Sequence, residues 1–335
     1  MLNTDQISLV TFAVVLRQFG DYERAKKYYQ RISVRSRQQG LNVAQLHHNW
    51  GRAHFDAGEY NEALAQHLVA LQHVMPSEMI GMVVILTDIA ATYQALGNIN
   101  LAELYCHKAM MYLIKNIVSW NPLHPIIIST CTKLGWFFAR TDRSEKAIQM
   151  YQKALQVGKA TYPKDHPELA NIYNNLGGVH KDMKKWNSAL YYYELARKIS
   201  DKVMITSPTT ATIYNNIGVV YLSMNDLKVG KNYLYQALKM RLAIMSEDHP
   251  DLFTSYANIA DVHKAKHEIV LARIWYKILA TMTARRLPVG HSIRIYAHLQ
   301  LGSMYYLLFE WEKSVLFTRS RKNDTEFVQS RGKYG

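Results

Sequence analysis

Apolar residues recur along most of the chain with the spacing of amphipathic helices. Residues 166–203 hold two such stretches in succession, each with apolar side chains three or four positions apart. These are Leu169, Ile172, Tyr173 and Leu176 in the first stretch and Ala189, Tyr192, Tyr193 and Ala196 in the second. Short turns such as Ala57-Gly58-Glu59-Tyr60 separate paired stretches, and glycine supplies the left-handed conformation that ends a helix. The pattern therefore predicts antiparallel pairs of helices.

The helix pairs repeat with a period close to 42 residues. A small residue marks the second helix of each pair, at successive steps of 38, 39, 45, 42, 41, 42 and 42 residues. It is Ala25, Ala63, Ala102, Ala147, Ala189, Gly230, Ala272 and Ser314. Another small residue marks the first helix, at Ala13, Gly51, Ala90, Gly135, Gly177, Gly218, Ala260 and Gly302. A fixed period of this kind indicates a repeat array, in which neighbouring units bury each other's apolar faces.

Four prolines mark the start of the first helix in successive units. Pro125, Pro167, Pro208 and Pro250 lie 42, 41 and 42 residues apart. Proline suits the first helical position, where its missing N–H costs nothing. The residues before these prolines are His124, His166, Ser207 and His249, and His291 continues the step without a proline. We expect these residues to cap the helices.

Glycine occupies the small position of the first helix in five units, where it costs about 0.5–1 kcal/mol relative to alanine. Because the glycines share one position, we expect the two helices of a pair to cross there. The tyrosine of the second helix is then expected to pack against each glycine. These residues are Gly51, Gly135, Gly177, Gly218 and Gly302.

The repeats resemble tetratricopeptide repeats, and four of them resemble the longer repeats of kinesin light chains. Lys164-Asp165-His166-Pro167 precedes Asn174-Asn175-Leu176-Gly177, and Glu247-Asp248-His249-Pro250 precedes Ala257-Asn258-Ile259-Ala260. Ser207-Pro208 with Asn215-Asn216-Ile217-Gly218 is a weaker copy. The resemblance implies an all-α right-handed superhelix of about eight helix pairs, whose concave face takes up extended peptide segments. No sustained heptads accompany the repeats, so attachment to a motor is not implied.

We expect one array over residues 1–317 and a polar, disordered tail over residues 318–335. The repeats are expected near 5–38, 43–75, 77–118, 124–161, 166–203, 207–245, 249–286 and 291–317. A solenoid end without a polar cap exposes apolar faces. We therefore expect the ends either to associate with another copy or to continue into a longer protein.

A polar position lies two residues before the small residue of the first helix. It holds Asn49, Asp88, Lys133, Asn175, Asn216, Asn258 and Gln300. An amide both donates and accepts, so a row of amides could hold the backbone of a peptide, or it could join neighbouring repeats. Basic residues fall on or near the same side, and Arg140 is one of them. The expected peptide-binding residues are Asn49, Arg52, Lys133, Asn174, Asn175, Lys181, Asn215, Asn216, Asn258 and Lys264.

The charge of the chain bears on its partner. Forty Lys and Arg against 26 Asp and Glu give a net charge of +14, which favours proteins or peptides with acidic segments. An RNA-binding solenoid is an alternative, since the chain also has 23 tyrosines, but most of these occupy repeat positions that the core needs. The resemblance suggests a second alternative, a substrate-recruiting appendage of a larger enzyme such as an ADP-ribosyltransferase.

Other chemistry finds little support in the sequence. The histidines that recur once in each repeat are expected to lie a helix pair apart, which is over about 10 Å. Zinc ligands each lie about 2 Å from one ion, so these histidines cannot share a zinc site. Two cysteines cannot frame a disulfide scaffold, and Cys106 falls at a core position. Glycine-rich phosphate motifs and a Gly-x-Ser-x-Gly elbow are missing, and the apolar stretch 79–91 is too short to span a bilayer. We expect a noncatalytic, cytoplasmic scaffold or adaptor without cofactor, metal or membrane contact.

Overall fold

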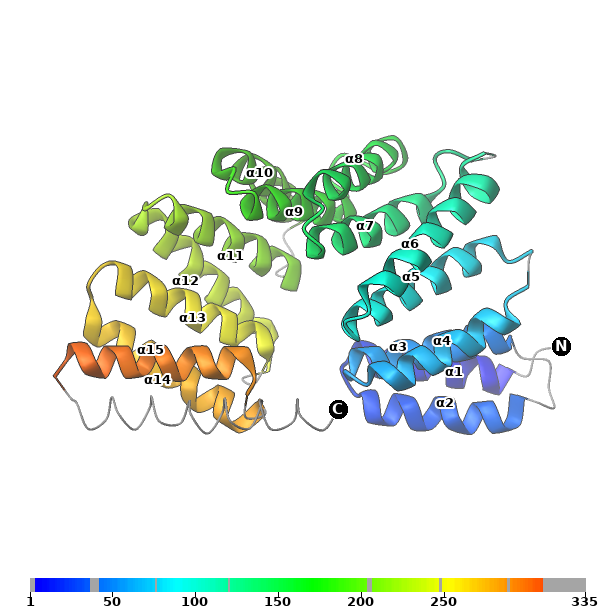
Figure 1. Ribbon diagram of the computed structural model, residues 1–335, viewed down its shortest axis with the longest axis horizontal. Coiled ribbons are helices and arrows are strands. Elements are labelled where there is room, and N and C mark those ends of the chain that lie inside the picture. The colour runs from blue at the N-terminus through cyan, green and yellow to red at the C-terminus, as the bar shows by residue number, and fades with distance from the viewer. Residues whose placement is uncertain are drawn as a thin grey trace. The chain divides into compact units, whose positions relative to one another are not determined.

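The computed structural model describes residues 4–36, 42–75, 77–119, 121–203, 207–246, 249–287 and 290–309. Within these ranges every regular element is a helix. The helices form two compact units, Met1–Pro163 and Lys164–Gly335 (Figure 1). None of the described helices combines the length and the apolar character that crossing a membrane requires.

The described part of the first unit contains eight α-helices. They are α1 (Thr4–Gln18), α2 (Tyr22–Ser36), α3 (Val43–Asp56), α4 (Tyr60–His73), α5 (Met79–Ala95), α6 (Ile99–Leu113), α7 (Pro125–Arg140) and α8 (Ser144–Thr161). A π-helical segment, η1 (Ile114–Val118), continues α6. Each odd-numbered helix packs on the next helix, and α2 and α4 also pack on the first helix of the following pair.

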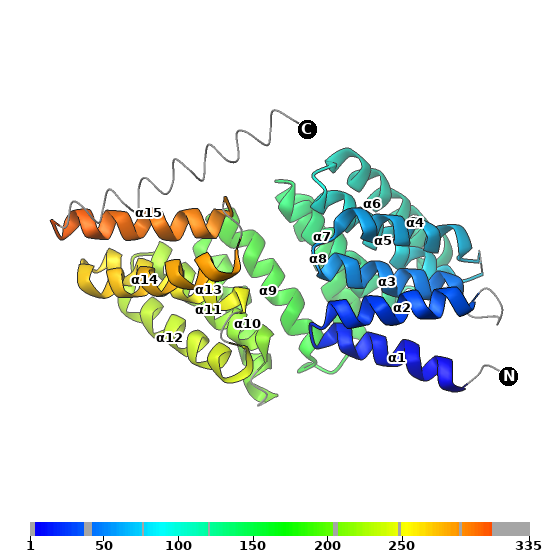
Figure 2. The same ribbon diagram turned by 90° about the horizontal axis from the view of Figure 1, so that it is seen from below.

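The second unit follows the same plan (Figure 2). Its described helices are α9 (Pro167–Asp182), α10 (Trp186–Lys202), α11 (Pro208–Ser223), α12 (Leu227–Ile244), α13 (Pro250–Ala265), α14 (Ile269–Arg286) and α15 (Ser292–Leu307). The second helix expected around Ser314 and the tail expected over 318–335 lie outside the described residues. The predicted all-α fold of stacked helix pairs is confirmed, while one continuous array over residues 1–317 stays a prediction.

The predicted helix caps are confirmed. The Nδ1 atom of His166 accepts a hydrogen bond from the backbone N–H of Glu168, at 3.2 Å. The Ser207 hydroxyl accepts one from the N–H of Thr210, at 3.1 Å. His124, His249 and His291 cap α7, α13 and α15 in the way that His166 caps α9. The recurrent histidine is therefore a capping residue in this fold.

The glycines of the first helices lie where the paired helices cross. A Cβ atom on Gly177 would stand 2.6 Å from the ring of Tyr193, and one on Gly135 would stand 2.7 Å from the ring of Tyr151. Gly51 on α3 approaches a histidine of α4 in the same way, and Gly218 on α11 approaches a leucine of α12. The prediction of close crossings is confirmed for these four glycines, with side chains other than tyrosine in two pairs. The second helix that would pair with Gly302 lies outside the described residues.

The turns inside the pairs differ along the chain. Gly58 ends α3 with a φ of +81°, as the sequence predicts. Later turns place other residues in the left-handed region, with φ between 55° and 64°, at Asp142, Lys184, Asn225 and His267. The backbone shape is therefore kept where glycine is absent.

Candidate peptide-binding surfaces

Three side chains of the first unit meet around the carboxylate of Asp88. Lys133 Nζ on α7 lies 2.5 Å from Asp88 Oδ1, and His48 Nε2 on α3 lies 2.7 Å from Asp88 Oδ2. Arg52 Nε, one turn beyond His48, lies 4.0 Å from the same oxygen. We call His48, Arg52, Asp88 and Lys133 the Asp88 cluster. It joins the first helices of three successive pairs.

The cluster carries an excess of positive charge. Burial alone would raise the pKa of the Asp88 carboxyl, but the Lys133 ammonium and the His48 hydrogen bond hold that pKa well below its usual range. Asp88 is therefore an anion at neutral pH, and it faces two permanent cations, Lys133 and Arg52. One negative charge does not balance both cations, so the cluster suits an additional anionic group.

An exposed tryptophan extends this surface along α7. Trp136 lies three residues after Lys133 and is 44 % exposed. The guanidinium carbon of Arg140, one turn further, lies over its ring, 5.6 Å from the centroid. Lys133, Trp136 and Arg140 thus share one side of α7. Asn49, the remaining predicted residue of this unit, is half-buried on α3 and stands outside these contacts.

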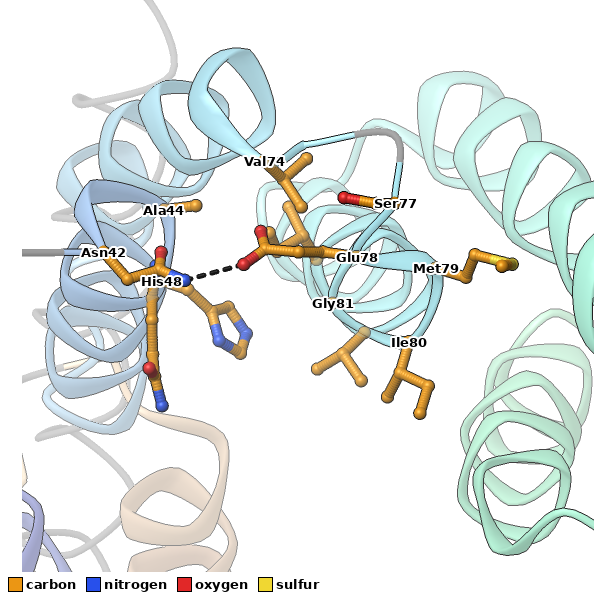
Figure 3. A pocket seen from close by; sticks show the side chains of 12 residues that line it. Asn42, Ala44, His48, Val74, Ser77, Glu78, Met79, Ile80 and Gly81 are labelled. Carbon is orange, nitrogen blue, oxygen red and sulfur yellow. Dashed lines mark hydrogen bonds between the residues drawn. The ribbon is translucent and has the colours of Figure 1, made fainter.

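A pocket of about 460 Å³ opens between the N-terminal parts of α3 and α5 (Figure 3). The amide of Asn42 donates a hydrogen bond to the Glu78 carboxylate across it, at 2.8 Å. Much of the lining is apolar, including Val74, Ile80 and further aliphatic side chains of α5. His48 lines the pocket and also belongs to the Asp88 cluster, so the pocket and the Asp88 cluster are continuous.

In the second unit the predicted asparagines join neighbouring repeats. Asn216 Nδ2 donates to Asn174 Oδ1 at 3.0 Å, and Asn258 Nδ2 donates to Asn215 Oδ1 at 2.9 Å. Both bonds connect first helices of adjacent pairs. Asn215 is buried, whereas its neighbour Asn216 is half-buried. The row of amides that the sequence indicates is therefore present, and part of its bonding capacity is used between repeats.

The remaining predicted residues of this unit lie on the same first helices. Asn175 is half-buried on α9, next to Asn174. Lys264 donates to the Gln300 side chain at 2.7 Å, which links α13 to α15. The ammonium of Lys181 lies 3.3 Å from the carboxylate of its neighbour Asp182. The structure thus groups Lys133 and Arg52 on one carboxylate but gives each of the two predicted lysines of the second unit a separate partner.

The expected residues did not include three that define the unit 1 surface. Asp88 occupies the recurrent polar position, so its place in the row was a usable signal. His48 directly precedes that position, and it contacts Asp88 from the preceding repeat, as Asn174 contacts Asn216. Trp136 carries no repeat signal, since its exposure follows only from the packing of α7.

The buried reactive groups sit in packing positions. Burial raises the pKa of the Cys106 thiol to about 12 and that of the Cys131 thiol to about 11. Such thiols stay protonated at neutral pH and are poor nucleophiles. Within the described ranges, no three His, Cys, Asp or Glu side chains gather as the ligands of a metal ion would.

Comparison with known proteins indicates which kind of repeat the chain contains. Residues 128–202 and residues 210–251 each match a family model described as tetratricopeptide repeat. No curated protein matches the chain. The quorum sensor NprR from B. thuringiensis, in its apo form, has a similar structure, with a TM-score of 0.69 and 13 % identity over 96 % of this chain and 87 % of that one.

Two further solved structures are similar to the chain. BtubC (BKLC) from P. vanneervenii has a TM-score of 0.56 and 22 % identity, covering 68 % of this chain and 89 % of that one. The nearly identical repeats of a putative kinesin light chain from Podosopora anserina have a TM-score of 0.54 and 14 % identity, covering 62 % and 98 %. At these identities the likeness concerns the fold.

Proposed function

The chain carries tetratricopeptide repeats, and from this premise we propose that it is a noncatalytic scaffold or adaptor that binds extended peptide segments of partner proteins. The observation that carries the proposal is the Asp88 cluster, with its excess of cations beside an exposed tryptophan and an apolar pocket. The first helices supply the cluster and the tryptophan, and they share the lining of the pocket with Val74 and Ser77, which lie between α4 and α5. The binding surface therefore follows from the repeat architecture.

Each part of the unit 1 surface suits a different part of a peptide. Lys133 and Arg52 attract acidic side chains and raise the rate of encounter. The flat ring of Trp136 offers a large contact area of the kind that dominates many interfaces. The pocket between α3 and α5 has room for an apolar side chain. The expected ligand is an extended segment that carries acidic residues and an apolar anchor.

The asparagine row of unit 2 supports a second contact with peptide backbone. An amide has two N–H donors and an acceptor oxygen, and the bond of Asn216 or Asn258 to the preceding repeat uses one donor. We assign peptide contact to Asn175, Asn216 and Asn258. Asn174 and Asn215 accept those bonds, so we assign them to the spacing of the repeats. Peptide binding that survives alanine at Asn175, Asn216 and Asn258 in a folded variant would refute this assignment.

A binding experiment with matched variants tests the unit 1 surface. Peptides with acidic and apolar residues are screened, and the dissociation constant of the best is measured by fluorescence anisotropy. We expect Lys133→Ala to weaken binding about tenfold, which corresponds to about 1.4 kcal/mol. Lys153→Ala is the control, because it removes the same charge from an exposed position on α8. If both variants weaken binding equally, net charge alone attracts the peptide and the proposed site is wrong.

The tyrosines favour a protein partner over RNA. Four of the largest fully buried side chains are Tyr29, Tyr151, Tyr193 and Tyr276, one in each of four second helices. Rings in the core cannot stack on the bases of a single strand. Binding of random RNA with a steep dependence on salt concentration would contradict this reasoning.

A further inference from the structure

Helix α14 has an apolar stripe on its exposed side. Val270 is 52 % exposed, Leu271 43 %, Ile274 45 % and Ile278 36 %. Three of them follow one another at intervals of four residues, so they lie along one side of the helix. We call these four residues the α14 stripe. It is separate from the first helices that carry the proposed peptide contacts.

The core of the unit does not account for the stripe. α14 packs between α13 and α15 through other residues, among them Ala272, Tyr276 and Leu279, which are fully buried. Three residues of the stripe lie two residues before and two and six residues after Ala272, and Leu271 directly precedes Ala272. A helix that is apolar on both its buried and its exposed sides needs a further partner to cover the second side.

The equivalent positions in the other second helices show that the stripe is particular to α14. In α12 they hold Lys228, Asn232 and Gln236, and in α8 they hold Glu145, Gln149 and Lys153. The first of the three is polar in every earlier pair, as Glu23, Asn61, Asn100, Glu145, Asn187 and Lys228. Of the seven described second helices, α14 is the one in which all three are apolar. The repeat pattern therefore does not require apolar residues there.

The charges beside the stripe indicate the kind of partner. α14 contains four basic residues and no acidic residue in its 18 positions. Lys277 is exposed next to Ile278, and Arg285 is exposed two turns beyond Ile278 on the same side. A second copy would bring the same cations against each other if two α14 stripes paired. An acidic partner would instead match both the stripe and its flanks.

We propose that the α14 stripe is a docking surface for an amphipathic helix of a partner protein, with acidic residues beside the apolar side of that helix. The stripe runs over nine residues from Val270 to Ile278, or about 12 Å of helix. A partner helix would place its apolar residues, spaced three and four apart, against the side chains of this stripe. Its carboxylates would lie near Lys277 and Arg285.

The test uses the full chain and a synthetic helical peptide of about 18 residues, five turns, with leucines on one side and glutamates elsewhere. A second peptide has lysines in place of the glutamates. The double variant Ile274→Asn, Ile278→Gln gives α14 the residues of α12 at these positions. Asn232→Ala on α12 is the matched control. Binding is measured by fluorescence anisotropy, and circular dichroism checks that each variant is folded.

We expect the glutamate peptide to bind the wild-type chain at least tenfold more tightly than the lysine peptide does. We expect the double variant to weaken that binding at least tenfold and the control to leave it unchanged. The proposal is overturned if the glutamate peptide does not bind, or if the double variant binds it as tightly as the wild type. It is also overturned if sedimentation shows a dimer that the double variant loses, or if phosphatidylserine vesicles bind through the stripe in place of the peptide.

Discussion

Replacing Gly177 by alanine tests whether the mid-helix glycines serve the crossing of the paired helices. The new Cβ would stand 2.6 Å from two carbons of the Tyr193 ring, closer than nonbonded carbons approach. That ring is fully buried in α10, so it cannot swing into solvent. The change therefore forces a shift in the core of this pair.

Two opposing terms set the magnitude. Alanine in place of glycine inside a helix gains about 0.5–1 kcal/mol. Overpacking a core costs about 1–3 kcal/mol. We expect the free energy of unfolding of Gly177→Ala to fall by about 0.5–2 kcal/mol.

The adjacent glycine provides a matched control. A Cβ on Gly178 would meet its nearest neighbour, the Tyr193 hydroxyl oxygen, at 3.8 Å, an ordinary contact distance. Gly178→Ala therefore keeps the helix-forming gain without the clash, and it is expected to stabilise the protein by about 0.5–1 kcal/mol. Since the gain is common to both variants, the difference between them isolates the overpacking of about 1–3 kcal/mol.

Thermal and urea unfolding followed by circular dichroism measure this difference. For a unit of this size, 1 kcal/mol corresponds to about 2–4 °C in Tm. The double variant Gly177→Ala, Tyr193→Ala is expected to be less destabilised than the sum of its parts, because the smaller side chain leaves room for the new methyl group. If Gly177→Ala is as stable as Gly178→Ala, the crossing argument is refuted.

Three further predictions concern stability and reactivity. Burial lowers the pKa of His67 from 6.5 to about 4, so the unfolded chain binds more protons between these values and stability falls on acidification. Relative to His67→Leu, the wild type should lose about 2 kcal/mol between pH 7 and pH 5 in urea unfolding, and parallel curves would contradict this. Ser207→Ala should destabilise by about 1 kcal/mol, with Ser207→Asp close to wild type in the same assay. Cys106 and Cys131 should react with a disulfide reagent at pH 8 only in denaturant, and rapid labelling of the native chain would show otherwise.

The elements of the fold were predictable because their signals are local. Each of these signals lies within one helix pair and determines the structure of nearby residues. Examples are the cap and proline at the start of α9, the apolar spacing along it and Gly177. The turns were predictable only in part, since Asn225 and His267 adopt the left-handed conformation that the sequence suggests for glycine.

The candidate surfaces were less predictable because they depend on contacts between repeats. Asp88 and Lys133 lie 45 residues apart, and only the stacking of α5 and α7 brings their charges together. Asn215 and Asn216 look alike in sequence, yet one is buried and the other half-buried. The α14 stripe has the composition of a core segment, and only its alignment with the polar residues at the same positions of the earlier pairs indicates that it is exposed.

The residues at the helix crossings keep a constant spacing in the sequence, and this spacing bears on where the chain can gain or lose residues. In the pairs formed by Gly51 and His67, Gly135 and Tyr151, Gly177 and Tyr193, and Gly218 and Leu234, the two partners stand 16 residues apart. The differences in repeat length therefore arise outside this interval, as where η1 extends α6 ahead of α7. We therefore expect insertions and deletions to be tolerated where they leave this interval intact, and a helix pair to be exchangeable as a unit when the break falls between pairs.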